Sequence, residues 1–173
     1  MEKTLKTLVE MFYDRSLFDP YYKDIHGMCE AFILKEDNKL IILPCTTKMC
    51  VIFDTRKKPT TLEDYTDTYN HIVFITKGVV KKQSFHGVKI EYFTIQELSF
   101  NISRHVLVPS HKIVMKDKQK IMNDYNLKTL LMLPHILYTD PMAKYIGAVK
   151  GDVVEVVRQS ISSGEHRVFR ICV

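Results

Sequence analysis

The sequence predicts a mixed α/β fold of the α+β type, in which short helices and short strands share one chain. Three observations support this prediction. Apolar side chains within residues 5–12 follow the i, i+3, i+4, i+7 spacing of one buried helical stripe. Compact apolar runs of strand length, such as residues 71–76, recur between polar turns. An Asp-Pro pair and a glycine bound a further short helix over residues 140–147.

The first hundred residues begin with the helix at residues 5–12, which we expect to end before Asp19-Pro20 because proline disfavours the helical conformation of the residue preceding it. Two brief helices are expected to begin at capping boxes, one at Thr61 with Asp64 and running to about Asn70, the other at Thr94 with Glu97. The apolar runs predict strands over residues 31–35, 40–43, 49–53, 71–76 and 88–93, the first two joined by a turn at residues 36–39.

The remaining residues predict a second set of elements. Residues 104–108 are expected to be extended and to end at Pro109, and residues 116–126 to form a helix with Ile121, Met122 and Tyr125 on its apolar side. Asp140 should cap the next helix, Pro141 occupy its first turn and Gly147 end it. Residues 153–158 and 167–173 should pair as an antiparallel hairpin around a loop at residues 159–165.

Charge is distributed unevenly and predicts two domains, residues 1–103 and 104–173. Residues 1–103 hold equal numbers of acidic and basic side chains, so residues 104–173 carry the whole formal net charge of +5. This excess fits a surface that faces nucleic acid or an acidic protein, and it equally fits solvated lysines along a helix. Both interpretations stay open.

Several function classes find no support in the composition. The four cysteines, Cys29, Cys45, Cys50 and Cys172, lack zinc-ligand spacing and are expected to be buried reduced thiols. No apolar run reaches the length of a membrane span, and there is no glycine-rich phosphate loop or nucleophile-elbow motif. We therefore expect no catalytic residue, metal, cofactor, small-molecule substrate or membrane association.

The second domain carries five ordered motifs that resemble a known family. Residues 104–111 (RHVLVPSH) resemble H-x-L-V-P-x-H, with Val106 and Ser110 departing from the usual polar residues. Residues 133–136 (LPHI) and 139–147 (TDPMAKYIG) resemble L-P-x-I followed by D-P-V-A-R-Y-x-G. Residues 150–158 (KGDVVEVVR) resemble K-R-G-x-V-V-K-I-I-R, and residues 163–173 resemble S/A-G-R-Y-x-x-Y-R. The family is the small jaw-and-assembly subunit shared by eukaryotic RNA polymerases I, II and III, together with its archaeal counterpart.

The first domain adds a weaker match. Residues 6–15 are similar to the first helix of the eukaryotic jaw, although Ser16-Leu17 replace its Gly-Tyr. The resemblance implies that residues 1–103 form a nuclease-like jaw without nuclease activity, beside downstream double-stranded DNA. It implies that residues 104–173 form a small α+β assembly domain on the largest polymerase subunit. Archaeal versions lack the jaw, and the shortened jaw favours a version from a large nucleocytoplasmic DNA virus. The protein is then expected in the nucleus of a cell, or in the cytoplasmic factory and virion of a virus.

The resemblance and the chemistry of the side chains together predict two surfaces. A capped helix and a two-stranded ribbon are stiff, and arginine is well suited to interfaces through its planar fork of donors. The caps alone also explain Asp140, Pro141 and Gly147, so a purely structural role stays open for them. The expected interface residues are His105, Pro109, His111, Asp140, Pro141, Tyr145, Gly147, Arg158, Arg167 and Arg170; those expected near DNA are Arg15, Lys23, Lys35 and Lys39.

Two alternatives come from other classes of function. Asp37-Asn38-Lys39, with an earlier acid such as Asp19 or Asp24, satisfies the D-x-K half of a metal-dependent nuclease site, although Asp-Asn also favours a plain turn. A stand-alone basic DNA-binding module could use a lysine-rich helix carrying Lys112, Lys116 and Lys120. No aromatic or arginine side chain accompanies those lysines to read bases.

Overall fold

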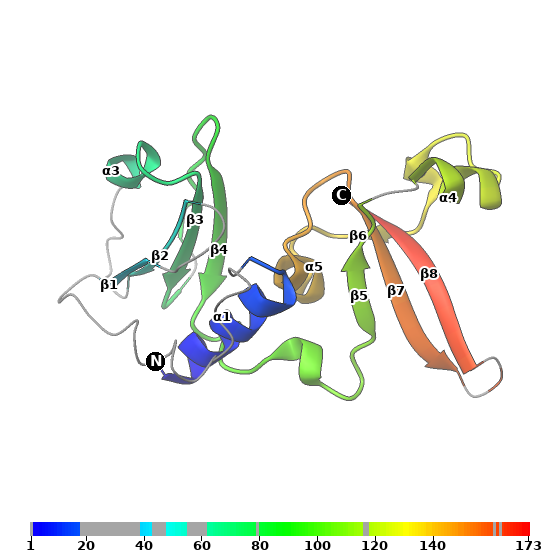
Figure 1. Ribbon diagram of the computed structural model, residues 1–173, viewed down its shortest axis with the longest axis horizontal. Coiled ribbons are helices and arrows are strands. Elements are labelled where there is room, and N and C mark those ends of the chain that lie inside the picture. Colours follow the sequence, from blue (N-terminus) through cyan, green and yellow to red (C-terminus); the bar gives the residue numbers. More distant parts are fainter. Residues whose placement is uncertain are drawn as a thin grey trace. The chain divides into compact units, whose positions relative to one another are not determined.

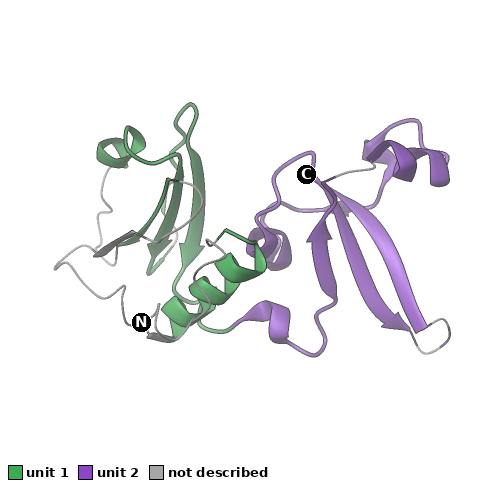
Figure 2. Ribbon diagram, viewed as in Figure 1, with its two compact units in different colours: residues 1–100 green, residues 101–173 purple. Residues whose placement is uncertain are grey.

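The computed structural model describes residues 2–17, 39–42, 48–54, 62–78, 80–115, 118–160, 162 and 164–173. The chain divides into two compact units, residues 1–100 and 101–173 (Figure 2), and each is described by itself. Both units combine helices with a sheet, so the fold is α+β. The predicted strand at residues 31–35 and the helix end at Asp19-Pro20 lie outside the described residues.

Unit 1 is built on a four-stranded mixed sheet (Figure 1). Its strands follow in chain order: β1 (Lys39–Ile42), β2 (Met49–Asp54), β3 (His71–Thr76) and β4 (Lys89–Thr94). β1 runs antiparallel to β2, whereas β2, β3 and β4 run parallel. Every residue of β2 and β3 is buried, as expected of parallel strands covered on both faces. The strands predicted at residues 40–43, 49–53, 71–76 and 88–93 are confirmed to within one residue.

The two faces of this sheet carry different cores. Cys50, Ile52, Ile72 and Phe74 pack on one face with Leu62, which precedes the single-turn helix α3 (Glu63–Thr66). The other face of the sheet carries the remaining side chains of the strands, among them Glu91 of β4. This face lies next to α1 (Glu2–Asp14), because Arg15, directly after α1, bonds Glu91. α1 buries Leu8, Val9, Met11 and Phe12, which confirms the predicted stripe, and it also buries Thr4 and Thr7.

The two brief helices expected in unit 1 are shorter than predicted or absent. Thr61 lies outside the described residues, and α3 stops at Thr66 instead of continuing to about Asn70. At Thr94 the box does form, since Thr94 N donates to Glu97 Oε2 at 2.7 Å and Glu97 N to Thr94 Oγ1 at 3.2 Å. Only hydrogen-bonded turns follow it. A cap satisfies the first backbone groups of a helix, but it supplies no apolar face to stabilise further turns.

Unit 2 is built on a second four-stranded sheet in the order β5-β7-β8-β6. β7 (Val153–Ser160) and β8 (Gly164–Cys172) form the predicted antiparallel hairpin, which extends into most of the expected loop. β5 (Ser110–Ile113) lies antiparallel to β7, and the two-residue β6 (His135–Ile136) lies parallel to β8.

Alternating side chains of the hairpin build one core on each face of this sheet. Val154, Val156 and Cys172 pack with Ala143 of helix α5 (Pro141–Ile146). Val153 and Ile171 pack on the other face with Ile121 of α4 (Lys118–Asp124) and with Leu130 of the 3-10 turn η2 (Leu130–Met132). α4 ends at Asp124, two residues before the predicted end at residue 126, and residues 116 and 117 lie outside the described residues. Tyr125 lies beyond the helix, exposed and in edge contact with Phe169, with the ring centroids 5.8 Å apart.

The segment before β5 corrects a further prediction. Residues 104–108 were expected to be extended, but they begin at the end of a 3-10 turn, η1 (Ile102–Arg104), and continue through a second turn. Asn101 produces this difference, because its side-chain oxygen accepts from the backbone N of Ser103 at 3.0 Å and caps η1. β5 begins only after Pro109.

Helix α5 has both predicted caps. Asp140 Oδ1 accepts from the backbone N of Met142 at 2.8 Å and of Ala143 at 3.3 Å, and Pro141 occupies the first turn. Gly147 ends the helix in the left-handed conformation, at φ 73° and ψ 26°. Two fixed ends hold a helix that is too short to be stable alone.

Removing the N-terminal cap should destabilise unit 2 without disturbing its surface. We expect Asp140→Ala to lower the free energy of unfolding by about 1 kcal/mol, because two backbone N–H groups lose their acceptor. Urea denaturation followed by circular dichroism measures the change. Thr139→Ala, at the exposed neighbouring position, is the matched control and should unfold like the wild type; equal stability of the two variants would contradict the capping role.

Candidate docking surface

Helix α5 presents less of itself to a partner than the sequence indicated. Met142, Ala143 and Tyr145 are buried, and Tyr145 is only 5% exposed. Tyr145, an expected interface residue, therefore lies mainly in the interior of the unit. Pro141 is exposed, whereas Asp140 and Gly147 are partly buried and hold the helix ends.

The three predicted arginines of the hairpin differ in their availability. Arg158 is exposed and lies directly across from His166, which is also exposed. Arg167 is exposed on the opposite face, where Nη1 lies 3.5 Å from Glu155 Oε1 and Nη2 lies 3.9 Å from Glu165 Oε2. Arg170 is half-buried, and its Nη1 donates to the carbonyl oxygen of His135 at 3.0 Å. Arg158 and Arg167 are thus the exposed guanidinium groups of the hairpin, while Arg170 ties β8 to β6.

The residues before β5 form a hydrogen-bonded turn, which we call the 105–108 turn. Val108 N donates to the carbonyl of His105 at 2.9 Å, and Leu107 N donates to His105 Nδ1 at 3.2 Å. Pro109 follows, and its carbonyl bonds His111 Nδ1 at 2.8 Å. His105 is exposed, whereas Pro109 and His111 are half-buried. The predicted residues His105, Pro109 and His111 thus meet in one local structure.

The 105–108 turn also exposes two apolar side chains that were not among the predicted site residues. Val106 is 95% exposed and Leu107 is 84% exposed. The hydropathy pattern did not predict this exposure, because the consecutive apolar residues Val106, Leu107 and Val108 are typical of a buried strand. The available signal was the departure at Val106 from a usually polar position of the motif. Val106 and Leu107 are thus among the most exposed apolar side chains of this unit.

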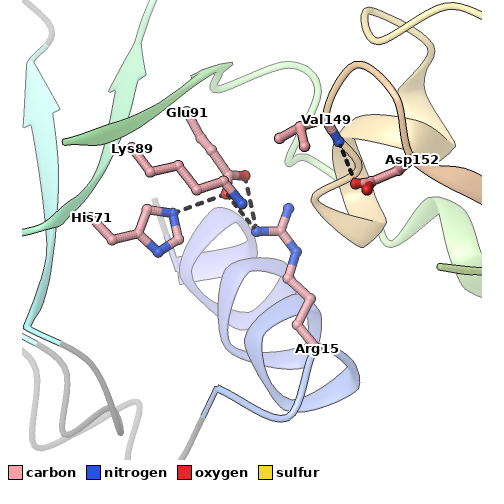
Figure 3. Close-up of polar contacts among 6 residues, drawn as sticks. All are labelled: Arg15, His71, Lys89, Glu91, Val149 and Asp152. Atoms are coloured by element: carbon pink, nitrogen blue, oxygen red, sulfur yellow. Dashed lines mark hydrogen bonds and ion pairs between the residues drawn. The ribbon is translucent and has the colours of Figure 1, made fainter. Parts of the chain in front are cut away.

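Arg15, expected near DNA, is engaged within unit 1. The Arg15 side chain is only 6% exposed, and Nη1 lies 3.0 and 2.9 Å from the two carboxylate oxygens of Glu91 (Figure 3). His71 Nε2 donates to Glu91 Oε1 at 2.9 Å, and Lys89 Nζ lies 3.0 Å from the same oxygen. A guanidinium engaged in this way offers little to a DNA phosphate. Lys39 begins β1, while Lys23 and Lys35 lie outside the described residues.

The groups around Glu91 keep its carboxyl ionised. Burial alone would raise the pKa of this carboxyl, but Arg15, the hydrogen bond from His71 and Lys89 together hold the pKa far below its ordinary value. Glu91 therefore stays charged inside unit 1, and its partners compensate the desolvation. Figure 3 also shows a bond within unit 2, where Val149 N donates to Asp152 Oδ2 at 3.0 Å.

The described residues contain no group of three histidine, cysteine or acidic side chains that could hold a metal ion. Asp19, Asp24, Asp37 and Asn38 of the nuclease alternative lie outside the described residues. Cys50 and Cys172 are buried free thiols, as predicted, and burial raises the pKa of Cys50 to about 12. Cys29 and Cys45 lie outside the described residues. Within the described chain, no helix is long and apolar enough to cross a membrane.

Unit 2 is therefore a small α+β unit with a helix capped at both ends, an exposed ribbon and an exposed apolar turn. Residues 100–172 match the family model described as RNA polymerase Rpb5, C-terminal domain. Over 188 residues the chain is 28% identical to DNA-directed RNA polymerases I, II, and III subunit rpabc1 of Dictyostelium discoideum, covering 97% of this chain and 94% of that subunit.

An archaeal relative matches unit 2 more closely. DNA-directed RNA polymerase subunit Rpo5 of Pyrococcus horikoshii is 38% identical over 74 residues, which is 43% of this chain and 90% of that subunit. Subunit RPABC1 of Caenorhabditis elegans is 36% identical over 85 residues, which is 49% of this chain and 40% of that subunit. The chain belongs to the Rpb5 family of RNA polymerase subunits.

The buried ion pair generates a stability prediction for unit 1. We expect Arg15→Ala to lower the free energy of unfolding by about 3–5 kcal/mol, because the Glu91 carboxylate loses its least exposed partner. Lys89→Ala is the matched control; its ammonium is largely exposed, so the loss should stay within about 1 kcal/mol. Amide hydrogen exchange of β3 reports on unit 1 directly. Equal losses for the two variants would contradict the dominant role of Arg15.

The same carboxylate generates a pH dependence. In the unfolded chain Glu91 takes up a proton near its ordinary pKa of about 4.3, whereas in the folded unit its pKa is lower. Its stabilising contribution is therefore complete above about pH 5 and falls as the pH drops toward the folded value. Glu91→Gln should be less stable at pH 7 and lose less stability between pH 5 and pH 3. Glu63→Gln, at an exposed position of α3, should keep the wild-type profile in acid denaturation; an unchanged slope in Glu91→Gln would contradict the assignment.

Proposed function

We propose that this chain is a non-catalytic subunit of a multisubunit DNA-dependent RNA polymerase. In this proposal residues 104–173 form an assembly domain that docks on the largest subunit. Residues 1–103 form a jaw with an inactive nuclease-like fold beside downstream DNA during transcription. The protein would reside with its polymerase, in the nucleus of a cell or in the factory and virion of a virus.

One observation carries the proposal most directly. The Pyrococcus subunit is matched over 90% of its own length by a segment that is only 43% of this chain. The matched family model ends at residue 172 and begins at residue 100, beside the first residue of unit 2. Unit 2 therefore corresponds to nearly all of an archaeal polymerase subunit, which supports unit 2 as the part that joins the enzyme.

The geometry of unit 2 suits adhesion. Apolar cores cover both faces of the sheet near β6, and caps fix both ends of α5. The surface of unit 2 in this region is therefore preformed. A preformed surface loses little conformational entropy on binding. Arg158 and Arg167 lie on opposite faces of the hairpin and can reach carboxylates with paired donors.

Unit 1 is proposed to make only a few contacts, and these with DNA. Its mixed sheet agrees with an α/β jaw, but Arg15 is engaged with Glu91, which leaves Lys23, Lys35 and Lys39 as the proposed DNA-facing residues. Because residues 1–103 have no net charge, any contact with DNA should be weak and independent of base sequence.

Co-purification tests this proposal. A tagged full-length chain should recover the two large polymerase subunits from cells that contain the polymerase, while the free chain should bind duplex DNA weakly. Arg158→Glu should lower the recovery at least about tenfold, because a reversed charge meets an interface that favours a cation. Lys120→Glu, an exposed reversal on α4, should leave it unchanged.

The alternatives predict other outcomes in the same preparation. Tight, steeply salt-dependent DNA binding that Lys120→Glu abolishes would support the stand-alone DNA-binding module. Magnesium-dependent cleavage of DNA by the purified chain would support the nuclease. Failure of the wild-type chain to recover any polymerase subunit would overturn the proposed function.

A further inference from the structure

The 105–108 turn of unit 2 exposes two adjacent apolar side chains to an unusual degree. Val106 is 95% and Leu107 is 84% exposed. A single exposed leucine is ordinary on a protein surface. Val106 and Leu107, however, are adjacent on one short turn and are more exposed than the other adjacent apolar pairs of the unit, Leu131 with Met132 and Leu137 with Tyr138; we call Val106 and Leu107 the apolar projection.

This projection stands on a fixed backbone. On its N-terminal side Asn101 caps η1, with its Oδ1 accepting from Ser103 N at 3.0 Å and Ser103 Oγ at 2.7 Å. Within the turn His105 accepts through both its carbonyl, from Val108 N at 2.9 Å, and its Nδ1, from Leu107 N at 3.2 Å. These bonds hold the backbone of Leu107 and Val108 but leave the side chains of Val106 and Leu107 uncovered.

The C-terminal side of the turn is fixed as well. Pro109 restricts the backbone, and its carbonyl bonds His111 Nδ1 at 2.8 Å. His111 then pairs with Val156 in the register of β5 and β7. The turn is thus joined to the central hairpin of the unit. A fixed apolar projection is preorganised for insertion into a pocket, which reduces the entropy lost on binding.

We propose that Val106 and Leu107 insert into an apolar pocket with an acidic rim on the largest polymerase subunit. This inference rests on the proposed function and assigns its central contact. The partner follows from two observations: the turn lies within residues 100–172, which match the polymerase-subunit family model, and residues 104–173 carry the net charge of +5. Arg104 and Lys112, on either side of the turn, favour acidic groups around an apolar centre.

Serine substitutions in the full-length chain test the proposal. Val106→Ser and Leu107→Ser should each lower the recovery of the largest subunit at least about tenfold, because each removes an apolar side chain from the contact. Leu107→Met, which keeps the apolar volume, should retain the recovery. Met115→Ser is the matched control, since Met115 is also 84% exposed and lies in the same unit; it should behave as wild type.

Three results would overturn the inference while leaving the proposed function intact. Wild-type recovery by both serine variants would show that the turn lies outside the interface. A lower melting temperature of the free Leu107→Ser chain would show that the turn is covered within the chain itself. A wild-type dimer in sedimentation that Leu107→Ser dissociates would show that a second copy covers it. Failure of the wild-type chain to recover polymerase would instead overturn the proposed function.

Discussion

The antiparallel pairing of β7 with β8 is the interaction on which unit 2 depends. Its register determines which side chains lie on each face, so Val154 and Val156 meet α5 while Val153 and Ile171 meet α4 and η2. β5 and β6 attach to its two outer edges. Because side chains alternate strictly, a slip of one residue would place Val153 and Val154 on each other's faces and remove both cores. The place of the 105–108 turn depends on this hairpin, because β5, which follows the turn, pairs with β7.

The sequence predicted those elements whose signal is local. Asp140, Pro141 and Gly147 specify α5 through backbone chemistry within a few residues, and the structure has those caps. The apolar runs of β2 and β3 were equally clear. The sequence failed where the deciding partner was a side chain with no periodic signal. Asn101 converts an apparent strand at residues 104–108 into turns, and no hydropathy pattern distinguishes a buried Leu107 from an exposed one. Ser16 takes φ 55° where the family pattern has glycine, so the chain tolerates a left-handed residue there.

Unit 1 shows how a charge that suggests a binding role can serve the fold. Arg15 was expected near DNA because the resemblance places residues 1–103 beside downstream DNA and a guanidinium can contact phosphates. The partner that engages it, Glu91, lies 76 positions away, and parallel strand pairing brings that residue opposite Val73. A buried carboxylate requires its cations, and the pairing of Glu91 with Arg15 joins α1 to β4. Such long-range compensation is invisible to any window of sequence, which is why it reassigned a predicted site residue.

Folding removes apolar side chains from water, whereas binding a partner uses apolar side chains at the surface. In unit 2 these two groups of apolar side chains lie at different places. Side chains such as Val153, Val154 and Ile171 are removed from water by the unit itself, whereas Val106 and Leu107 remain on a turn that hydrogen bonds hold. If packing alone stabilised that turn, exposing its apolar residues would unfold it; because Asn101 and His105 hold the backbone through polar contacts, the two side chains are left free for a partner. Unit 2 thus has a core that is complete within the chain itself, and in the proposed function a partner covers the side chains that this core leaves exposed.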